Sequence, residues 1–113
     1  MSESIIQHDI RLALSGLPGV VIWRNNVGIA FYPDGSRVRY GLGGPGGSDL
    51  IGMVDGRFTS IEVKSATGQE SKEQALFRAL VKAKGGFSCI ARSIEEACEA
   101  IERARGFTPP VPD

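Results

Sequence analysis

The sequence predicts a single α/β domain in which a mixed sheet is flanked by helices, an α/β/α arrangement. Two observations carry this prediction. Segments with helical periodicity alternate with short β-rich runs, and an Asp-Gly pair divides the central β-rich region into a hairpin. The predicted order is helix, strands, central hairpin, helix, strand, helix. With 113 residues, the chain is long enough to bury one modest hydrophobic core.

The first helix is predicted over Glu3–Ser15, because Ile6, Ile10 and Leu14 recur at helical spacing. Ser2 precedes it as a capping residue, and a glycine and a Pro-Gly pair follow it.

A short strand is predicted over Val20–Trp23. Trp23 is expected in the core, with a stacking platform as the alternative. Arg24 and Asn25 follow this strand and are candidates for contact with a phosphate group.

A second hairpin is predicted from the runs Gly28–Tyr32 and Ser36–Tyr40, which are joined by the turn residues Pro33-Asp34-Gly35. Arg37 and Arg39 alternate with apolar residues, so both point to one face. That face suits a DNA backbone, and an ordinary solvated hairpin face explains it equally well.

The central hairpin is predicted from Asp55-Gly56, which suits a type I′ turn because both central residues of that turn have positive φ. With this turn Val54 lies opposite Arg57, and counting back along both strands places Asp49 opposite Glu62. Facing side chains of antiparallel strands have Cβ atoms roughly 4.5–5.5 Å apart. The hairpin therefore brings two carboxylates into one small volume.

Two carboxylates at that separation repel each other, and a divalent cation removes the repulsion. Mg²⁺ is commonly bound by one or two carboxylates, with water and phosphate oxygens completing its shell. Lys64 lies two residues after Glu62, so the strand period places it on the same face. Asp49, Glu62 and Lys64 thus suit metal-dependent hydrolysis of a phosphodiester. A surface hairpin with solvated charges is the alternative.

A glycine-rich segment, residues 41–47, precedes Asp49. It is not a P-loop, because no Gly-Lys-Ser/Thr follows and it leads into a strand. It can serve as a plain connector, and its bare backbone can also let a phosphate approach Asp49 closely.

Ser71 and Gln74 form a predicted capping box that begins a helix ending near Lys84. The helix is expected to bury an apolar stripe of Leu76, Ala79, Leu80 and Ala83. Its exposed cations, as candidates for a phosphate track, are Lys72, Arg78 and Lys82.

A strand over Phe87–Ala91 and a helix from Ser93 to Gly106 complete the predicted elements. Residues 1–107 are expected to form one domain, and residues 108–113 a proline-rich tail.

The composition predicts an intracellular protein. There is no apolar run of roughly 18 residues or more and no signal-peptide pattern. Cys89 and Cys98 lack CxxC spacing and are expected to be buried thiols rather than a disulfide or zinc site. The net charge is zero, but residues 24–92 hold ten Lys or Arg and six Asp or Glu, the positive footprint that phosphate binding needs.

The segment Gly46-Gly47-Ser48-Asp49, followed after twelve residues by Glu62-Val63-Lys64, resembles the GxxD variant of the PD-(D/E)xK nuclease signature. The proline of the older motif is replaced, which leaves the acid in place. The helix opening Glu3–Gln7, the run Trp23–Gly28 and Gln74 narrow the resemblance to the VRR-NUC branch. It covers about residues 3–98, and this ordered set is more specific than an ExK motif alone.

The resemblance implies a restriction-endonuclease-like α/β/α core that binds Mg²⁺ or Mn²⁺. The implied metal ligands are Asp49, Glu62 and the backbone carbonyl of Val63. Lys64 would position the attacking water, Gln74 would support the site beside it, and Glu3 would help to hold a metal-bound water. The alternatives are that Gln74 only completes the capping box and that Glu3 only favours the helix dipole.

The resemblance also implies a DNA endonuclease that leaves 5′-phosphate and 3′-hydroxyl ends. Stand-alone members of the branch resemble homodimeric resolvases of four-way (Holliday) junctions, where two symmetric sites suit a two-fold substrate. The expected partners are therefore branched DNA and a second copy of the chain, with no membrane. The location that the resemblance implies is the cytoplasm of a bacterial or phage-infected cell. The alternatives are a nuclease for flaps or other branched DNA, a non-catalytic nucleic-acid-binding subunit that kept the fold, and a metal hydrolase acting on nucleotides or RNA.

Overall fold

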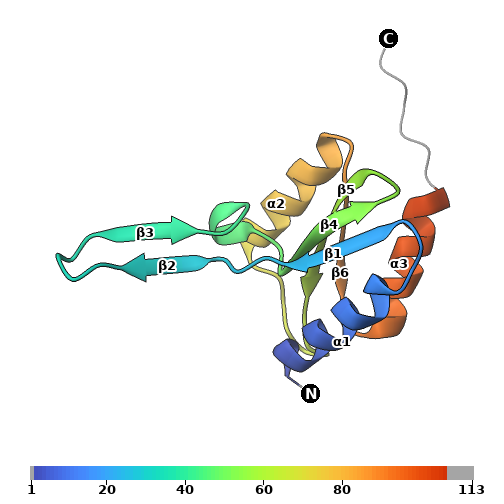
Figure 1. Cartoon of the computed structure of the whole chain (residues 1–113), viewed down its shortest axis with the longest axis horizontal. Coiled ribbons are helices and arrows are strands. Elements are labelled where there is room, and N and C mark those ends of the chain that lie inside the picture. Colours follow the sequence, from blue (N-terminus) through green and yellow to red (C-terminus); the bar gives the residue numbers. More distant parts are fainter. Residues whose placement is uncertain (1, 107–113) are drawn as a thin grey trace, which may run out of the picture.

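The computed structural model describes residues 2–106, which form an α/β fold with a mixed four-stranded sheet flanked by three helices (Figure 1). The helices are α1 (Glu3–Ser15), α2 (Lys72–Ala83) and α3 (Ile94–Gly106). The strands are β1 (Val20–Arg24), β2 (Gly28–Phe31), β3 (Arg37–Tyr40), β4 (Leu50–Val54), β5 (Arg57–Val63) and β6 (Phe87–Ala91), with a 3₁₀ turn η1 (Gly44–Gly46). The predicted fold class is confirmed, and it is compatible with a restriction-endonuclease-like core. The predicted tail, residues 108–113, lies outside the described residues.

The main sheet has the strand order β1-β4-β5-β6. The first three of these strands are antiparallel neighbours, and β6 runs parallel to β5. Parallel neighbours need a crossover connection, which α2 provides between β5 and β6. The turn residues Asp55 and Gly56 have φ of 51° and 81°, as a type I′ turn requires, and Val54 pairs with Arg57. The predicted register of the central hairpin is confirmed.

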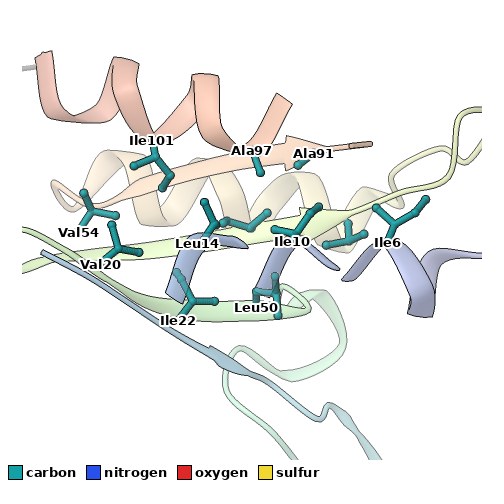
Figure 2. Close-up of a cluster of buried hydrophobic side chains, with 12 residues drawn as sticks. Ile6, Ile10, Leu14, Val20, Ile22, Leu50, Val54, Ala91, Ala97 and Ile101 are labelled. Atoms are coloured by element: carbon teal, nitrogen blue, oxygen red, sulfur yellow. The ribbon is translucent and has the colours of Figure 1, made fainter. Parts of the chain in front are cut away.

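The two faces of the sheet have different characters. Ile61 and Val63 of β5 are fully buried in an apolar cluster. The same cluster contains Ile10 and Leu14 of α1 and Ile101 of α3 (Figure 2). Successive strand residues point to opposite faces, so Glu62 points to the other side, where Gln74 of α2 contacts it. The hydrophobic core therefore lies between the sheet and α1 and α3, and the candidate site lies on the face that α2 covers.

The buried face of α2 differs from the predicted one. The predicted apolar stripe is exposed: Leu76, Ala79, Leu80 and Ala83. Val81 is buried instead, and Gln74 and Arg78 are partly buried. An apolar stripe would face inward over an apolar strand surface, but the strand face beneath α2 carries the buried polar residues Ser60 and Glu62. The helix therefore turns polar side chains towards the sheet and leaves its leucines outside.

Trp23 is also placed differently from the prediction, since it is 53 % exposed. Within β1, Val20 and Ile22 are the buried residues, so Trp23 points to the opposite face of the sheet. The only helix over that face, among the described residues, is α2, and it packs on β5 and β6 rather than on β1. The end of β1 is therefore left uncovered on the Trp23 side.

Strands β2 and β3 form a separate two-stranded ribbon that projects from the body of the molecule (Figure 1). We call residues 28–40 the arm. Its turn is closed by Asp34, whose Oδ1 accepts hydrogen bonds from the backbone N–H of Ser36 at 2.9 Å and from its hydroxyl at 2.6 Å. The predicted second hairpin is confirmed, and it does not join the main sheet.

The capping box of α2 is formed as predicted. Ser71 Oγ accepts the backbone N–H of Gln74 at 3.1 Å, and Gln74 Oε1 accepts the backbone N–H of Ser71 at 2.8 Å. Ser71→Ala is expected to lower the free energy of unfolding by about 1 kcal/mol, because the backbone N–H of Gln74 loses its side-chain acceptor. Urea unfolding measures the loss, and Ser71→Asp, which retains a capping oxygen, is the control. An unchanged urea midpoint in Ser71→Ala would show that the box does not stabilise the helix.

No helix among residues 2–106 is long and apolar enough to cross a membrane.

Candidate functional site

Asp49 lies immediately before β4, one position beyond the ladder pair of Leu50 with Ile61, and so across from Glu62. Its Oδ2 accepts the backbone N–H of Val63 at 2.9 Å. Its backbone carbonyl accepts the N–H of Asn25, after β1, at 2.8 Å. Hydrogen bonds to the segments on both sides therefore fix Asp49 at the end of the central hairpin.

Glu62 is the most deeply buried charged residue of the site, with 1 % of its surface exposed. Its Oε1 accepts a hydrogen bond from Gln74 Nε2 at 2.8 Å. Burial, and after it the nearby charge of Asp49, raises the pKa of Glu62 to about 8, whereas the charge of Lys64 acts in the opposite direction. The hairpin register, which sets Asp49 across from Glu62, brings the two carboxylates together as the sequence predicted.

Gln74 has two roles at once. Its Oε1 completes the capping box at Ser71, and its Nε2 donates to Glu62. From the sequence, Gln74 either completes the capping box or supports the site. It does both, because its amide oxygen binds Ser71 and its amide nitrogen binds Glu62. Gln74 ties the start of α2 to the central strand and fixes the orientation of the Glu62 carboxylate.

Lys64 directly follows β5 and is 9 % exposed. Its backbone N–H donates to the carbonyl of Ala91 at 3.1 Å, which extends the pairing of β5 with β6 by one residue. The strand period places its side chain on the same sheet face as Glu62. A mostly buried lysine on the sheet face of Glu62 is thus positioned by regular backbone pairing rather than by a loop.

Two buried polar atoms in this region have no hydrogen-bond partner among the described protein atoms, namely Glu62 Oε2 and Ser48 Oγ. Buried polar atoms are normally satisfied, because leaving one unmatched costs roughly 1–3 kcal/mol. A cation or a water would satisfy the free Glu62 oxygen. Ser48 precedes Asp49 and belongs to the Gly46–Asp49 motif. The sequence around it gives no sign that its hydroxyl is buried.

The donor set fits a hard divalent cation. Val63 donates its N–H to Asp49, and in a β-strand the C=O of a residue points towards the same neighbour as its N–H, so the Val63 carbonyl also points to the Asp49 side. No group of three or more His, Cys, Asp or Glu suited to a metal occurs within residues 2–106. Two carboxylates, a carbonyl and water form the sparse, oxygen-only shell that Mg²⁺ accepts.

The glycine-rich segment is anchored by Asn25. Its Nδ2 donates to the carbonyls of Leu42 at 2.8 Å and Ser48 at 3.0 Å, and its Oδ1 accepts the N–H of Leu42 at 3.0 Å. Both amide hydrogens are therefore engaged, so Asn25 cannot donate to a phosphate without releasing the loop. Asn25 is better explained as the residue that positions the chain entering Asp49.

Close packing accounts for two glycines of that segment. A Cβ on Gly46 would lie 2.1 Å from the carbonyl oxygen of Glu73, and one on Gly47 would lie 2.1 Å from that of Leu42. The loop thus packs tightly under the first turn of α2 and against itself, where no side chain fits. The second explanation, that the bare backbone lets a phosphate approach Asp49, stays a prediction.

Glu3 lies close to the loop that follows Lys64. A Cβ on Gly68 would lie 3.2 Å from Glu3 Oε2. The same loop is held from inside by Arg92, whose Nη1 donates to the carbonyls of Ser65 at 2.5 Å and Gly68 at 2.7 Å. Glu3 therefore lies beside the loop leaving the site, and its predicted role in holding a metal-bound water stays a prediction.

The predicted DNA-binding residues fall into two groups. Five are exposed cations: Arg24, Arg37, Arg39, Lys72 and Lys82. Arg78 differs from its prediction as an exposed cation, because its side chain is only 20 % exposed and paired with Glu70 through two hydrogen bonds of 2.5 and 2.7 Å. This two-pronged pair links the segment before α2 to the helix side that faces the sheet.

Glu70 is the site residue that the sequence did not indicate. Arg78 holds the pKa of Glu70 below its ordinary value, and the charge of Glu70 contributes to the raised pKa of Glu62. Glu70 and Arg78 are eight residues apart, with the start of α2 between them. Glu70 lies before the helix, so no helical or strand period relates the two residues, and the pair could not be predicted from the sequence.

No protein-family model matches the chain, and no curated protein matches it. The resemblance to VRR-NUC nucleases therefore stays a prediction from the sequence.

Proposed function

We propose that this protein is a metal-dependent DNA endonuclease that hydrolyses phosphodiester bonds with Mg²⁺ or Mn²⁺. The supporting observation is the pair of carboxylates, Asp49 and Glu62, fixed at the end of the central hairpin with one buried Glu62 oxygen unpartnered. Burying two like charges together is destabilising unless a proton or a cation neutralises one of them, and a divalent cation allows both carboxylates to be ionised. A protein that only binds nucleic acid needs no such pair.

The bound cation would polarise a phosphate oxygen and lower the pKa of a water molecule. The side chains would position the cation and stabilise charge during the reaction. Asp49 is held in place by the Val63 N–H, and Glu62 by Gln74, so neither carboxylate has to reorganise when substrate binds. Lys64 supplies an ammonium group on the same face, which can donate to a water or a phosphate oxygen and stabilise negative charge developing there.

The exposed cations outline a path for the DNA backbone on both sides of this site. Arg24 lies at the end of β1, one residue before Asn25, and Lys72 lies in the first turn of α2, two residues before Gln74. Arg37 and Arg39 extend the positive charge along the arm, away from the body of the molecule (Figure 1). We propose branched DNA as the substrate, in the first place a four-way junction cut by a homodimer, and this choice rests on the sequence resemblance.

Cleavage of a labelled four-way junction, beside a 5′ flap and a linear duplex, tests the proposal. Each substrate is incubated with Mg²⁺, with Mn²⁺ and with EDTA, using the wild-type chain and Lys64→Ala. Paired symmetric nicks on the junction that need metal and Lys64 are the expected result. Cleavage of the flap alone would retain the chemistry and reject the junction. Tight binding without cleavage of any substrate would reject the enzyme and support a non-catalytic binding subunit.

Replacing both arm arginines, Arg37→Ala with Arg39→Ala, is expected to weaken DNA binding similarly for different sequences. If both contact phosphates, the slope of log affinity against log salt concentration should fall by roughly two for each bound chain, because each contact contributes about 0.9. Fluorescence anisotropy at several salt concentrations measures this slope, with Lys84→Ala at the far end of α2 as the control. An unchanged slope would mean that the arm does not contact the DNA backbone.

A further inference from the structure

The two faces of the arm carry different side chains. Gly28 pairs with Tyr40, Ala30 with Val38, and Phe31 with Arg37. Since strand residues alternate, one face carries Ala30, Tyr32, Val38 and Tyr40, and the other carries Ile29, Phe31, Arg37 and Arg39. We call the first the uncharged face of the arm. Its three large side chains are about half exposed: Tyr32 53 %, Val38 46 % and Tyr40 47 %.

A second exposed apolar surface lies on α2. Leu76 and Leu80, which the sequence predicted to be buried, line a shallow groove with Phe77 and with Gly43 and Pro45 of the glycine-rich segment. We call this the α2 groove. Its volume of about 270 Å³ is below the roughly 300–1,000 Å³ of pockets for small ligands, so it suits side chains inserted from another surface.

The arm does not cover the α2 groove of its own chain. Strands β2 and β3 pack on each other, and no other described helix or strand packs extensively on either of them. Figure 1 shows the arm pointing away from α2. A two-stranded ribbon is marginally stable by itself in water, and exposed apolar surface of this extent marks an interaction site. Both surfaces therefore need a partner outside the chain.

We propose that the uncharged face of the arm docks in the α2 groove of a second copy of this chain. The arm of that second copy docks in turn in the α2 groove of the first. These two equivalent contacts form a closed dimer with two-fold symmetry. The proposal specifies the interface of the homodimer and rests on the proposed function to that extent. The opposite face of the arm then keeps Arg37 and Arg39 free to meet DNA.

The amount of apolar surface agrees with such a dimer. Tyr32, Val38, Tyr40, Leu76 and Leu80 are each about half exposed. With roughly 150–250 Å² for a large side chain, these residues of two chains expose on the order of 1,000 Å² together. Specific interfaces bury roughly 1,200–2,000 Å² in total, and neighbouring residues can supply the remainder. A second copy is favoured as the occupant because one chain carries both complementary surfaces.

The mass of the full chain in solution tests the proposal without any cleavage assay. Light scattering after size exclusion is expected to give the mass of two chains. Val38→Glu on the arm and Leu76→Glu in the groove should each raise the dissociation constant roughly 30-fold or more, as a charge at an interface centre does. Matched controls are Ile29→Glu, on the opposite face of the arm, and Leu12→Glu, an equally exposed leucine on α1; both should remain dimers.

Mixing two variants identifies the contact itself. Val38→Glu and Leu76→Lys should each be monomeric alone, but their mixture should regain a dimer. In the mixed dimer the new carboxylate on one arm meets the new ammonium group in the partner's groove, and the second contact stays native. A monomeric wild-type chain, or a dimer that both variants leave intact, would overturn the proposal. Loss of the dimer without recovery on mixing would also overturn it, in favour of a contact between two arms.

The nuclease site provides an independent control for the dimer. Asp49→Asn, expected to be inactive, should remain dimeric, so failure of this proposal is distinguishable from failure of the nuclease proposal.

Discussion

Asp49→Asn is expected to lower metal-dependent cleavage by roughly 10³-fold or more while leaving the chain folded. Asparagine keeps a side-chain oxygen that can accept the Val63 N–H, the hydrogen bond that Asp49 makes at 2.9 Å. It loses the negative charge that would hold the cation. Single-turnover cleavage of the four-way junction measures the loss, and the urea midpoint shows whether the fold is retained.

The same substitution has a second readout, since it removes the like charge beside Glu62. The pKa of Glu62 should therefore fall in Asp49→Asn, which carbon-detected NMR of the carboxyl group can follow. Asp9→Asn, which changes a partly buried aspartate on α1 outside the site, is the matched control and should cleave like the wild type. A rate for Asp49→Asn close to that of the wild type would contradict the assignment of Asp49 as a metal ligand.

Glu62→Gln is expected to stabilise the metal-free protein at slightly alkaline pH while abolishing cleavage. Burial, with the Asp49 charge, raises the pKa of Glu62 from 4.5 to about 8. Between these values the folded state retains a proton that the unfolded state has released, so stability falls as pH rises from about 4.5 to about 8. Glutamine is neutral throughout and can still accept from Gln74. The expected gain above the folded-state pKa is on the order of a few kcal/mol.

Urea unfolding in EDTA at pH about 5 and about 8.5 measures this difference. The wild type should be less stable at the higher pH, and the difference should be much smaller in Glu62→Gln. Adding Mg²⁺ should restore stability to the wild type mainly at the higher pH, because the cation binds the ionised carboxylate, and it should do so weakly in the variant. A wild-type stability that does not change between the two pH values would contradict the raised pKa of Glu62.

The parts of the site that follow from local geometry could be predicted from the sequence. The Asp-Gly turn sets the register of the hairpin, and the register places Asp49 across from Glu62. The period of a strand then places Lys64 on the face of Glu62. The capping residues of α2 likewise form a short-range pattern. Each of these features is decided by residues close in sequence, so no knowledge of the remaining fold was needed.

The features that depend on packing between segments far apart in the sequence could not be predicted. The inward face of α2 is set by the polar strand surface beneath it, so Arg78 and Gln74 turn inward and Leu76 turns outward, against the apolar periodicity. The role of Asn25 depends on carbonyls 17 and 23 residues away. Arg92 reaches across 27 residues to the loop after Lys64. No regular spacing in the sequence predicts such long-range contacts.

A crystal structure of the wild-type chain with Mn²⁺ shows directly whether Asp49 and Glu62 hold a divalent cation, as we propose. Anomalous scattering should place manganese within coordination distance of both carboxylates and the Val63 carbonyl, roughly 2.0–2.3 Å from each oxygen. The same crystals of Asp49→Asn should lack that peak. Manganese absent from the wild-type site at saturating concentration, or bound only elsewhere, would contradict the account.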